Sequence, residues 1–259
     1  MKYIYLRSSD IAKLTGHNKY QPKHKVINEL LSRNGIKDVY VPKSNLEEGL
    51  HELTPTQISI LREELNISQV SSLSDIEKHI KSTIIYPSQS GNLSEEESKR
   101  LVDIKTEGKE VLQTLLNSMK QDLRMRRGNV KENKNLDKIQ SEQKITINQR
   151  NSKMYTKELY RGETYCLIIR GKVDGISGDT IIETKNRTKY LFNELRGYER
   201  VQLECYCFLT GLQKALLTEH YNSESNMIEY EHDEEFWELC KENIIEFIDT
   251  NIVPHLTES

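Results

Sequence analysis

Three residues in one short stretch of this chain combine two carboxylates with an ammonium. The stretch reads GKVDGISGDTIIETKNR and contains Asp174, Glu183 and Lys185. Because side chains alternate across a strand, Glu183 and Lys185 project from the same face. If the two halves of the stretch pair as an antiparallel hairpin, Asp174 approaches that face as well. The pattern therefore predicts two converging carboxylates with a cation beside them.

Such a group is suited to a divalent metal ion and to phosphoester chemistry. Converging carboxylate oxygens form the hard site that Mg²⁺ or Mn²⁺ prefers, and we expect the backbone carbonyl of Thr184 and water to complete the ligand shell. A metal there polarises a phosphate and lowers the pKa of an attacking water, and Lys185 offsets the developing charge. A surface hairpin with alternating charges would show the same triplet, so these residues alone leave both interpretations open.

The elements expected around these residues predict an α/β fold. The β-branched and aromatic content, with turn residues at 175 and 177–179, predicts extended chain over residues 144–149, 164–176 and 179–187. Apolar periodicity predicts a helix over 198–213, a strand over 214–221 and a closing helix over 233–253. Together these elements predict a mixed central β-sheet flanked by helices.

Residues 44–103 differ from the rest of the chain in composition and are predicted to be a helical insertion without catalytic residues. Ser74 and Glu77 have the spacing of a helix-capping box. Farther along, Gly128 is expected to interrupt a helix and a second helix to carry Glu132.

Charge is distributed unevenly along the chain. The net charge is −3, but residues 120–161 hold 12 Lys and Arg against 5 Asp and Glu, while residues 219–259 hold 1 against 12. A basic block beside an acidic one suits a protein that binds a polyanion on one face. Two solvated helical faces of opposite sign are an equally simple interpretation.

Composition excludes several classes of protein. No apolar run approaches the roughly 18 residues of a membrane helix, and the start, MKYIYLRSSD, lacks a secretory signal. We therefore expect an intracellular, soluble protein without a membrane partner. The 4 cysteines form no C-x-x-C pair, which predicts buried thiols and no zinc or iron–sulfur site.

Four segments, in order, resemble one known family. IETK following KVDG resembles the core of the PD-(D/E)xK nuclease superfamily, and the likeness is greater to the lambda exonuclease/YqaJ group of viral recombinases. RSSDIAKLTGHNKYQP resembles that group's N-terminal helix, RRGNVKE its Gly-x-x-x-Glu helix, and RVQLECYCFLTG its Gln-containing helix. The likeness covers residues 6–40 and 104–255, and it implies a restriction-endonuclease-like core in a single nuclease domain spanning residues 1–259. Val173 stands where the family pattern has Pro.

The resemblance assigns roles to individual residues. It implies that Asp174 and Glu183 are metal ligands and that Lys185 is the catalytic lysine. It also implies that Glu132 completes the site or holds a second metal, and that Gln202 lies near the site. Tyr206, one helical turn beyond Gln202, is counted among the residues that contact nucleic acid.

Two further segments are predicted to contact phosphate. Arg7, Ser8 and Ser9 match the region that in the family grips a terminal or backbone phosphate, and an Arg with hydroxyls at a helix N-terminus forms a sound anion site. Plain helix capping by the serines is an equal alternative. The basic block that includes Arg127 would contact the DNA backbone, and binding should weaken as salt rises.

The function expected from this resemblance is that of a Mg²⁺-dependent DNA nuclease, a 5′–3′ exonuclease acting in recombination or repair. A structure- or sequence-specific endonuclease and a non-catalytic nucleic-acid-binding module are alternatives, and RNA remains open as a substrate. A homo-oligomer or a single-strand annealing partner is also expected from the family.

Overall fold

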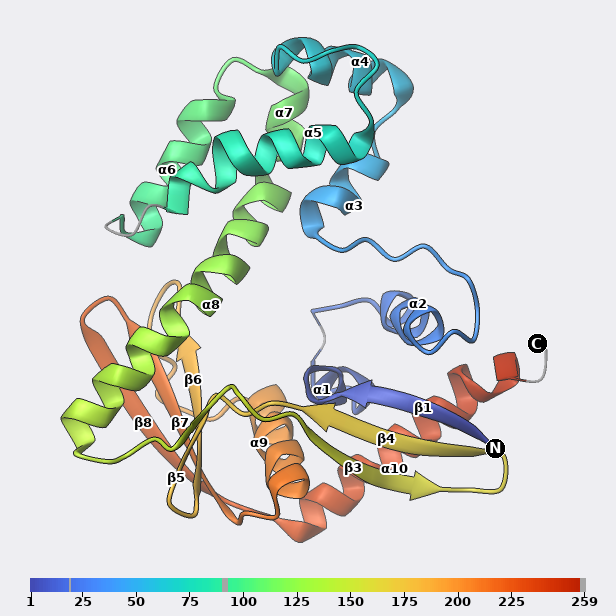
Figure 1. Cartoon of the computed structure of the whole chain (residues 1–259), viewed down its shortest axis with the longest axis vertical. Helices are drawn as coiled ribbons and strands as arrows, with labels where there is room; N and C mark the ends of the chain where they lie inside the picture. Colours follow the sequence, from blue (N-terminus) through green and yellow to red (C-terminus); the bar gives the residue numbers. More distant parts are fainter. Residues whose placement is uncertain (19, 90–92, 257–259) are drawn as a thin grey trace. The chain divides into compact units, whose positions relative to one another are not determined.

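The computed structural model describes residues 1–18, 20–89 and 93–256. Its contacts divide the chain into two compact units, residues 1–41 with 132–259 and residues 42–131 (Figure 1). The fold is α/β, with strands in two sheets and helices flanking them, which confirms the expected fold class. The helical segment expected at 44–103 lies inside the second unit.

A three-stranded sheet in the first unit has the order β1-β4-β3. Its strands are β1 (Lys2–Arg7), β3 (Tyr155–Arg161) and β4 (Tyr165–Gly171). β1 pairs parallel to β4, and β3 pairs antiparallel to it. The central strand β4, YCLIIRG, is the most apolar and is largely buried. After β4, residues 172–174 lead directly into the second sheet, so Asp174 lies where the two sheets are joined.

The second sheet has five strands in the order β2-β5-β6-β7-β8. They are β2 (Gln149–Arg150), β5 (Gly175–Ser177), β6 (Thr180–Asn186), β7 (Lys214–Tyr221) and β8 (Glu224–Glu231). β5 and β6 form the expected hairpin, with Gly178 in the left-handed region at a φ of 59°. β7 coincides with the predicted strand and pairs parallel to β6.

The two faces of β6 pack against different helices. Ile181 belongs to the main apolar core, which includes much of α9 (Gly197–Thr210). Ile182 belongs instead to a smaller cluster with Leu136 and Ile139 of α8 (Leu116–Gln143). Odd-numbered residues of β6 therefore point toward α9, and even-numbered residues point toward α8. Glu183 and Lys185 share the α9 face.

The remaining helices of the first unit complete its core. They are a 3-10 turn, η1 (Ser8–Asp10), and the helices α1 (Ile11–Leu14), α2 (Lys23–Arg33) and α10 (Glu234–Asn251), with a closing 3-10 turn at Val253–Leu256. α9 ends at Gly211, whose φ of 79° gives the left-handed C-cap that glycine favours. Asp233 caps α10 by accepting a bond from the Phe236 N–H at 3.0 Å. All 4 cysteines are buried and free, as expected.

The second unit is helical among its described residues. It contains α3 (Asn45–His51), α4 (Pro55–Glu64), α5 (Leu73–Ile80), α6 (Glu95–Thr106), α7 (Glu110–Thr114) and the first part of α8, with a π-helical turn at Lys81–Ile85 and a 3-10 turn at Pro87–Gln89. An apolar cluster of Leu, Ile, Val and Met side chains forms its core. None of the described helices is both long and apolar enough to cross a membrane.

Two local expectations were wrong in this region. The capping box of α5 is formed by Ser72 and Asp75, whose backbone and side chains exchange bonds of 3.1 and 3.2 Å, and not by Ser74 and Glu77. Gly128 lies inside the continuous helix α8 and does not interrupt it. A glycine costs a helix only about 1 kcal/mol relative to alanine, which is too little to end a long helix.

Candidate active site

The hairpin register brings Asp174 and Glu183 together. Gly175 pairs with Ile182 and Ile176 with Ile181, so continuing that register by one residue places Asp174 across from Glu183. The backbone N–H of Thr184 donates to Asp174 Oδ2 at 2.9 Å. Glu183 is only 3% exposed. Two carboxylates therefore converge at a buried point beside the junction of the sheets.

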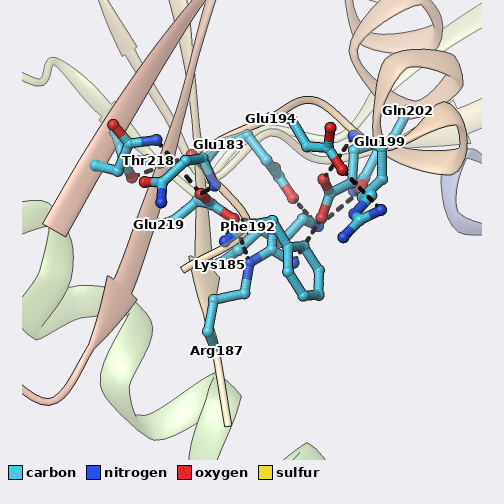
Figure 2. Close-up of polar contacts among 12 residues, drawn as sticks. Glu183, Lys185, Arg187, Phe192, Glu194, Glu199, Gln202, Thr218 and Glu219 are labelled. Atoms are coloured by element: carbon cyan, nitrogen blue, oxygen red, sulfur yellow. Dashed lines mark hydrogen bonds and ion pairs between the residues drawn. The ribbon is translucent and has the colours of Figure 1, made fainter. Parts of the chain in front are cut away.

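An ammonium and an amide extend this pair toward α9. Lys185 Nζ donates to Glu183 Oε1 at 2.6 Å and to Gln202 Oε1 at 2.8 Å, as Figure 2 shows. Gln202 Nε2 in turn donates to the Tyr206 hydroxyl at 2.8 Å. Gln202 and Tyr206 are one helical turn apart and so lie on the same side of α9. This chain of bonds holds the ammonium beside the acidic pair.

Charge within the site is poorly balanced. Burial, together with the neighbouring charge of Glu183, raises the pKa of Asp174 to about 9, although the Thr184 N–H opposes this. Burial by itself would lower the pKa of Lys185, but the charge of Glu183 and its hydrogen bond outweigh burial and raise it. Lys185 is therefore a cation at neutral pH, and one carboxyl of the pair is hard to ionise without a further positive charge.

These residues fit a divalent cation. Glu183 Oε2 is buried and has no hydrogen-bond partner, and such an atom is costly unless it is paired. A dication at the pair would satisfy this oxygen and allow Asp174 to ionise. Within the described ranges, no three His, Cys, Asp or Glu side chains form a metal-binding group by themselves. The Thr184 carbonyl as a further ligand stays a prediction.

Glu132 lies near this pair without joining it. It accepts a bond of 3.0 Å from Asn151 Nδ2, and the backbone N–H of Asn151 donates to the Asp174 carbonyl at 3.0 Å. The charge of Glu132 contributes to the raised pKa of Asp174. One residue thus connects Glu132 to the segment that carries Asp174, and its role as a ligand stays a prediction.

A second buried ion cluster adjoins the site and was missed in the sequence. Arg187 lies two residues beyond Lys185 on the same face and pairs with Glu199 of α9 at 2.7 Å and with Glu219 of β7 at 2.5 Å (Figure 2). Both carboxylates are fully buried. The alternation that selected Glu183 and Lys185 extends to Arg187 and could have drawn attention to it, but its partners could not be chosen from the sequence.

The predicted phosphate-binding residues near the N-terminus lie beside the strand that leads to Asp174. Arg7 and Ser9 are exposed, whereas Ser8 is buried. A Cβ added to Gly171, the last residue of β4, would lie 2.4 Å from Ser8 Oγ. η1 therefore packs tightly against the end of β4, three residues before Asp174. The binding of phosphate by these three residues stays a prediction.

Two residues predicted to contact nucleic acid have partners inside the protein, and their contact with nucleic acid stays a prediction. Arg127 is 9% exposed and donates to the Leu93 carbonyl at 2.7 Å and to the Ser98 hydroxyl within the helical unit. Tyr206 is 4% exposed, so its ring lies in the apolar core and not on a surface open to a base. Local charge and residue type could not reveal these internal partners, because they depend on tertiary packing.

Comparisons with known proteins give likeness at the level of solved structures. No family model matches the sequence, and no curated protein matches it either. The chain is similar to an alkaline exonuclease, LHK-Exo, from Laribacter hongkongensis, with 13% identity and a TM-score of 0.42 over 51% of this chain and 70% of that one. A structure of LHK-Exo in complex with dAMP gives 10% identity and a TM-score of 0.43 over 81% and 92% of the two chains.

A protein named SSO0001 gives 12% identity and a TM-score of 0.37, over 77% of this chain and 88% of that one. At these TM-scores the likenesses assign no activity to the chain, and the site geometry has to support any function.

Proposed function

We propose that this chain is a metal-dependent nuclease that hydrolyses phosphodiester bonds in DNA. The observation that carries the proposal is the buried pair Asp174 and Glu183, whose charge exceeds what the Lys185 ammonium can balance. A buried acidic pair that is short of positive charge suits a hard dication. A lysine directly beside it suits a reaction that builds up negative charge on phosphate oxygens.

The chain's own residues would divide the work between them. Asp174 and Glu183 would hold Mg²⁺ or Mn²⁺, with Glu132 and the Thr184 carbonyl as further ligands. A metal bound there would polarise a phosphate and lower the pKa of a bound water. Lys185, already held by Gln202, would donate to a phosphate oxygen as charge develops. Because the site is largely buried, these interactions would be stronger than in bulk water.

The direction and substrate of cleavage rest on the sequence resemblance. It supports a 5′–3′ exonuclease that acts in recombination or repair, with Arg7, Ser8 and Ser9 near a terminal phosphate. It also supports a homo-oligomer or an annealing partner. LHK-Exo is described as an alkaline exonuclease, which agrees with this proposal without adding weight to it.

The test is a cleavage assay on DNA of matched sequence in linear and closed circular form. Linear duplexes labelled at either end, with and without a 5′-phosphate, are incubated with Mg²⁺ or with EDTA. We expect shortening of the linear duplex from the 5′ end with Mg²⁺ alone, and an intact circle.

Three other outcomes would change or reject the proposed function. A cut circle would replace the exonuclease by an endonuclease, and cleavage of RNA alone would replace the substrate. DNA that is bound and stays intact in Mg²⁺ and Mn²⁺ would reject the nuclease in favour of a binding module.

A further inference from the structure

Arg187 joins three elements that meet at the candidate site. Its backbone belongs to the chain that leaves β6, and its N–H donates to the His220 carbonyl of β7 at 2.8 Å. Its guanidinium pairs with Glu199 of α9 at 2.7 Å and with Glu219 of β7 at 2.5 Å. Because Glu199 and Glu219 are fully buried, neither can exchange this partner for water.

Glu219 extends the same network into the loop between β6 and α9. Its carboxylate also accepts the backbone N–H groups of Phe192 and Asn193, at 3.3 and 2.9 Å. The Phe192 ring lies against the Arg187 guanidinium, with 4.1 Å between the guanidinium carbon and the ring centroid. The loop that delivers the chain into α9 is thereby fixed to β7 and to Arg187.

Two neighbouring contacts, an ion pair and a hydrogen bond, connect β6 and the residue after it to α9. Arg187 meets Glu199, and Lys185 meets Gln202. Lys185 and Arg187 are about 6.6 Å apart along the strand, and Glu199 and Gln202 about 4.5 Å apart along the helix. Since both contacts span the same gap between rigid elements, the geometry of one constrains the geometry of the other.

We propose that Arg187 is a positioning residue for the proposed cleavage reaction. By joining Glu199 to Glu219, it holds α9 at the distance from β6 at which Gln202 accepts the Lys185 ammonium. Lys185 is thereby kept beside Glu183 and aimed at the place where the substrate phosphate would lie. This inference rests on the proposed nuclease function for its consequence, although the positioning itself can be measured without it.

The chemistry of arginine explains why this residue type stands at the position. A planar guanidinium has several donors in a fixed fork and can pair with two carboxylates on different sides. A lysine carries the same charge at one point, so Arg187→Lys keeps the charge and loses the simultaneous contacts. That substitution therefore separates positioning from simple charge balance.

The test measures kcat, KM and thermal unfolding of Arg187→Lys with linear DNA and Mg²⁺. A misplacement near 1 Å costs about 10²-fold in rate, so we expect kcat to fall by about 10- to 100-fold while KM changes by less than about 3-fold. Arg200→Lys is the matched control, because Arg200 lies on α9 beside Glu199 but pairs with Asp233, a partly exposed residue. We expect the control to keep wild-type kcat.

A second variant and a cycle separate positioning from general destabilisation. If Arg187→Lys does not fold, Glu199→Gln removes one arm of the network while Arg187 keeps Glu219. Combining either variant with Gln202→Ala should lower kcat little further than Gln202→Ala alone does, because both changes release the same ammonium. A merely structural role would make the two losses multiply, and that result, or an unchanged kcat, would overturn the inference.

A readout without catalysis distinguishes the two proposals. In ¹⁵N-lysine NMR, assigned with Lys185→Arg, the wild-type Lys185 ammonium should give an ordered, slowly exchanging signal that Arg187→Lys or Glu199→Gln broadens or removes. If the variants lose this signal and the wild-type protein cleaves no DNA, the nuclease is rejected and the positioning is retained. A signal unaffected by either variant in a cleaving enzyme would reject the positioning alone.

Discussion

Two carboxyl groups, Asp174 just before the second sheet and Glu219 within it, behave in opposite ways. Asp174 has its pKa raised to about 9, because burial and the charge of Glu183 outweigh its single bond from the Thr184 N–H. Glu219 is fully buried, but its pKa is lowered. Burial alone would raise it, and the Asn193 N–H and the Arg187 guanidinium more than compensate.

The difference shows that burial does not set the state of a carboxyl group by itself. Glu219 has a complete set of donors and serves the fold, whereas Asp174 and Glu183 lack one and remain available to a ligand. A structural acid and a functional acid can therefore be separated by their partners. Substitutions at Glu183, Glu219 and Asp174 test the two sides of this difference. A substitution at Tyr206 tests the hydrogen bonds that extend from Lys185.

The largest effect is expected at the pair itself. Glu183→Gln removes a proposed metal ligand and a hydrogen-bond partner of Lys185, so we expect DNA cleavage to fall by about 10³-fold or more, corresponding to several kcal/mol of lost transition-state stabilisation. End-labelled DNA and gel analysis measure this. DNA binding by fluorescence anisotropy should persist, and a variant that still cleaves at the wild-type rate would remove Glu183 from the site.

The next effect falls on stability at the structural acid. Glu219→Gln leaves Arg187 buried with reduced compensation, and we expect a loss of about 3–5 kcal/mol in unfolding free energy. Urea denaturation followed by circular dichroism measures it. Glu224→Gln, at an exposed carboxylate on β8, is the control and should change stability by less than about 0.5 kcal/mol. Equal effects at both positions would contradict the structural role.

A substitution at Asp174 is expected to raise stability, the opposite of the effect at Glu219. The folded-state pKa of Asp174 is raised to about 9 from the ordinary 3.8 of an aspartate, so the unfolded chain loses this proton first as pH rises. Metal-free stability should therefore fall with pH across that window. Asp174→Asn should remove this slope and raise stability at neutral pH by on the order of 1–3 kcal/mol, while abolishing cleavage. Thermal melts in EDTA over a pH series measure it, and an unchanged slope would refute the assignment.

The smallest effect is expected at the end of the chain of bonds. Tyr206→Phe removes the hydroxyl that Gln202 donates to, a loss of about 0.5–1.5 kcal/mol for one hydrogen bond. We expect kcat to fall by roughly 2- to 10-fold with little change in fold. A loss as large as that of Glu183→Gln would mean that Tyr206 has a more direct part in the reaction.

Local rules were enough to predict the centre of the site. The grouping of Asp174, Glu183 and Lys185 follows from strand alternation and from one short hairpin, and both are readable within 12 residues. β7 and α10 were likewise marked by their apolar periodicity. These features could be predicted because neighbours in sequence decide them.

The remaining features of the fold and of the site depend on tertiary packing. β1, β3 and β8 were not predicted, because KYIYLR is short and YTKELYR and ESNMIEYE have few apolar residues. The partners of Arg187 lie 12 and 32 positions away, and only the assembled sheet and α9 bring them together. The partners of Arg127, Leu93 and Ser98, could not be predicted for the same reason, because they are far from it in the sequence.

The central claim is that a divalent cation binds between Asp174 and Glu183. Isothermal titration calorimetry with Mn²⁺, on the wild-type protein and on Glu183→Gln, tests it most directly. We predict saturable binding to the wild type that the substitution abolishes or weakens by at least about tenfold. Identical isotherms for the two proteins, or no binding to either, would contradict it.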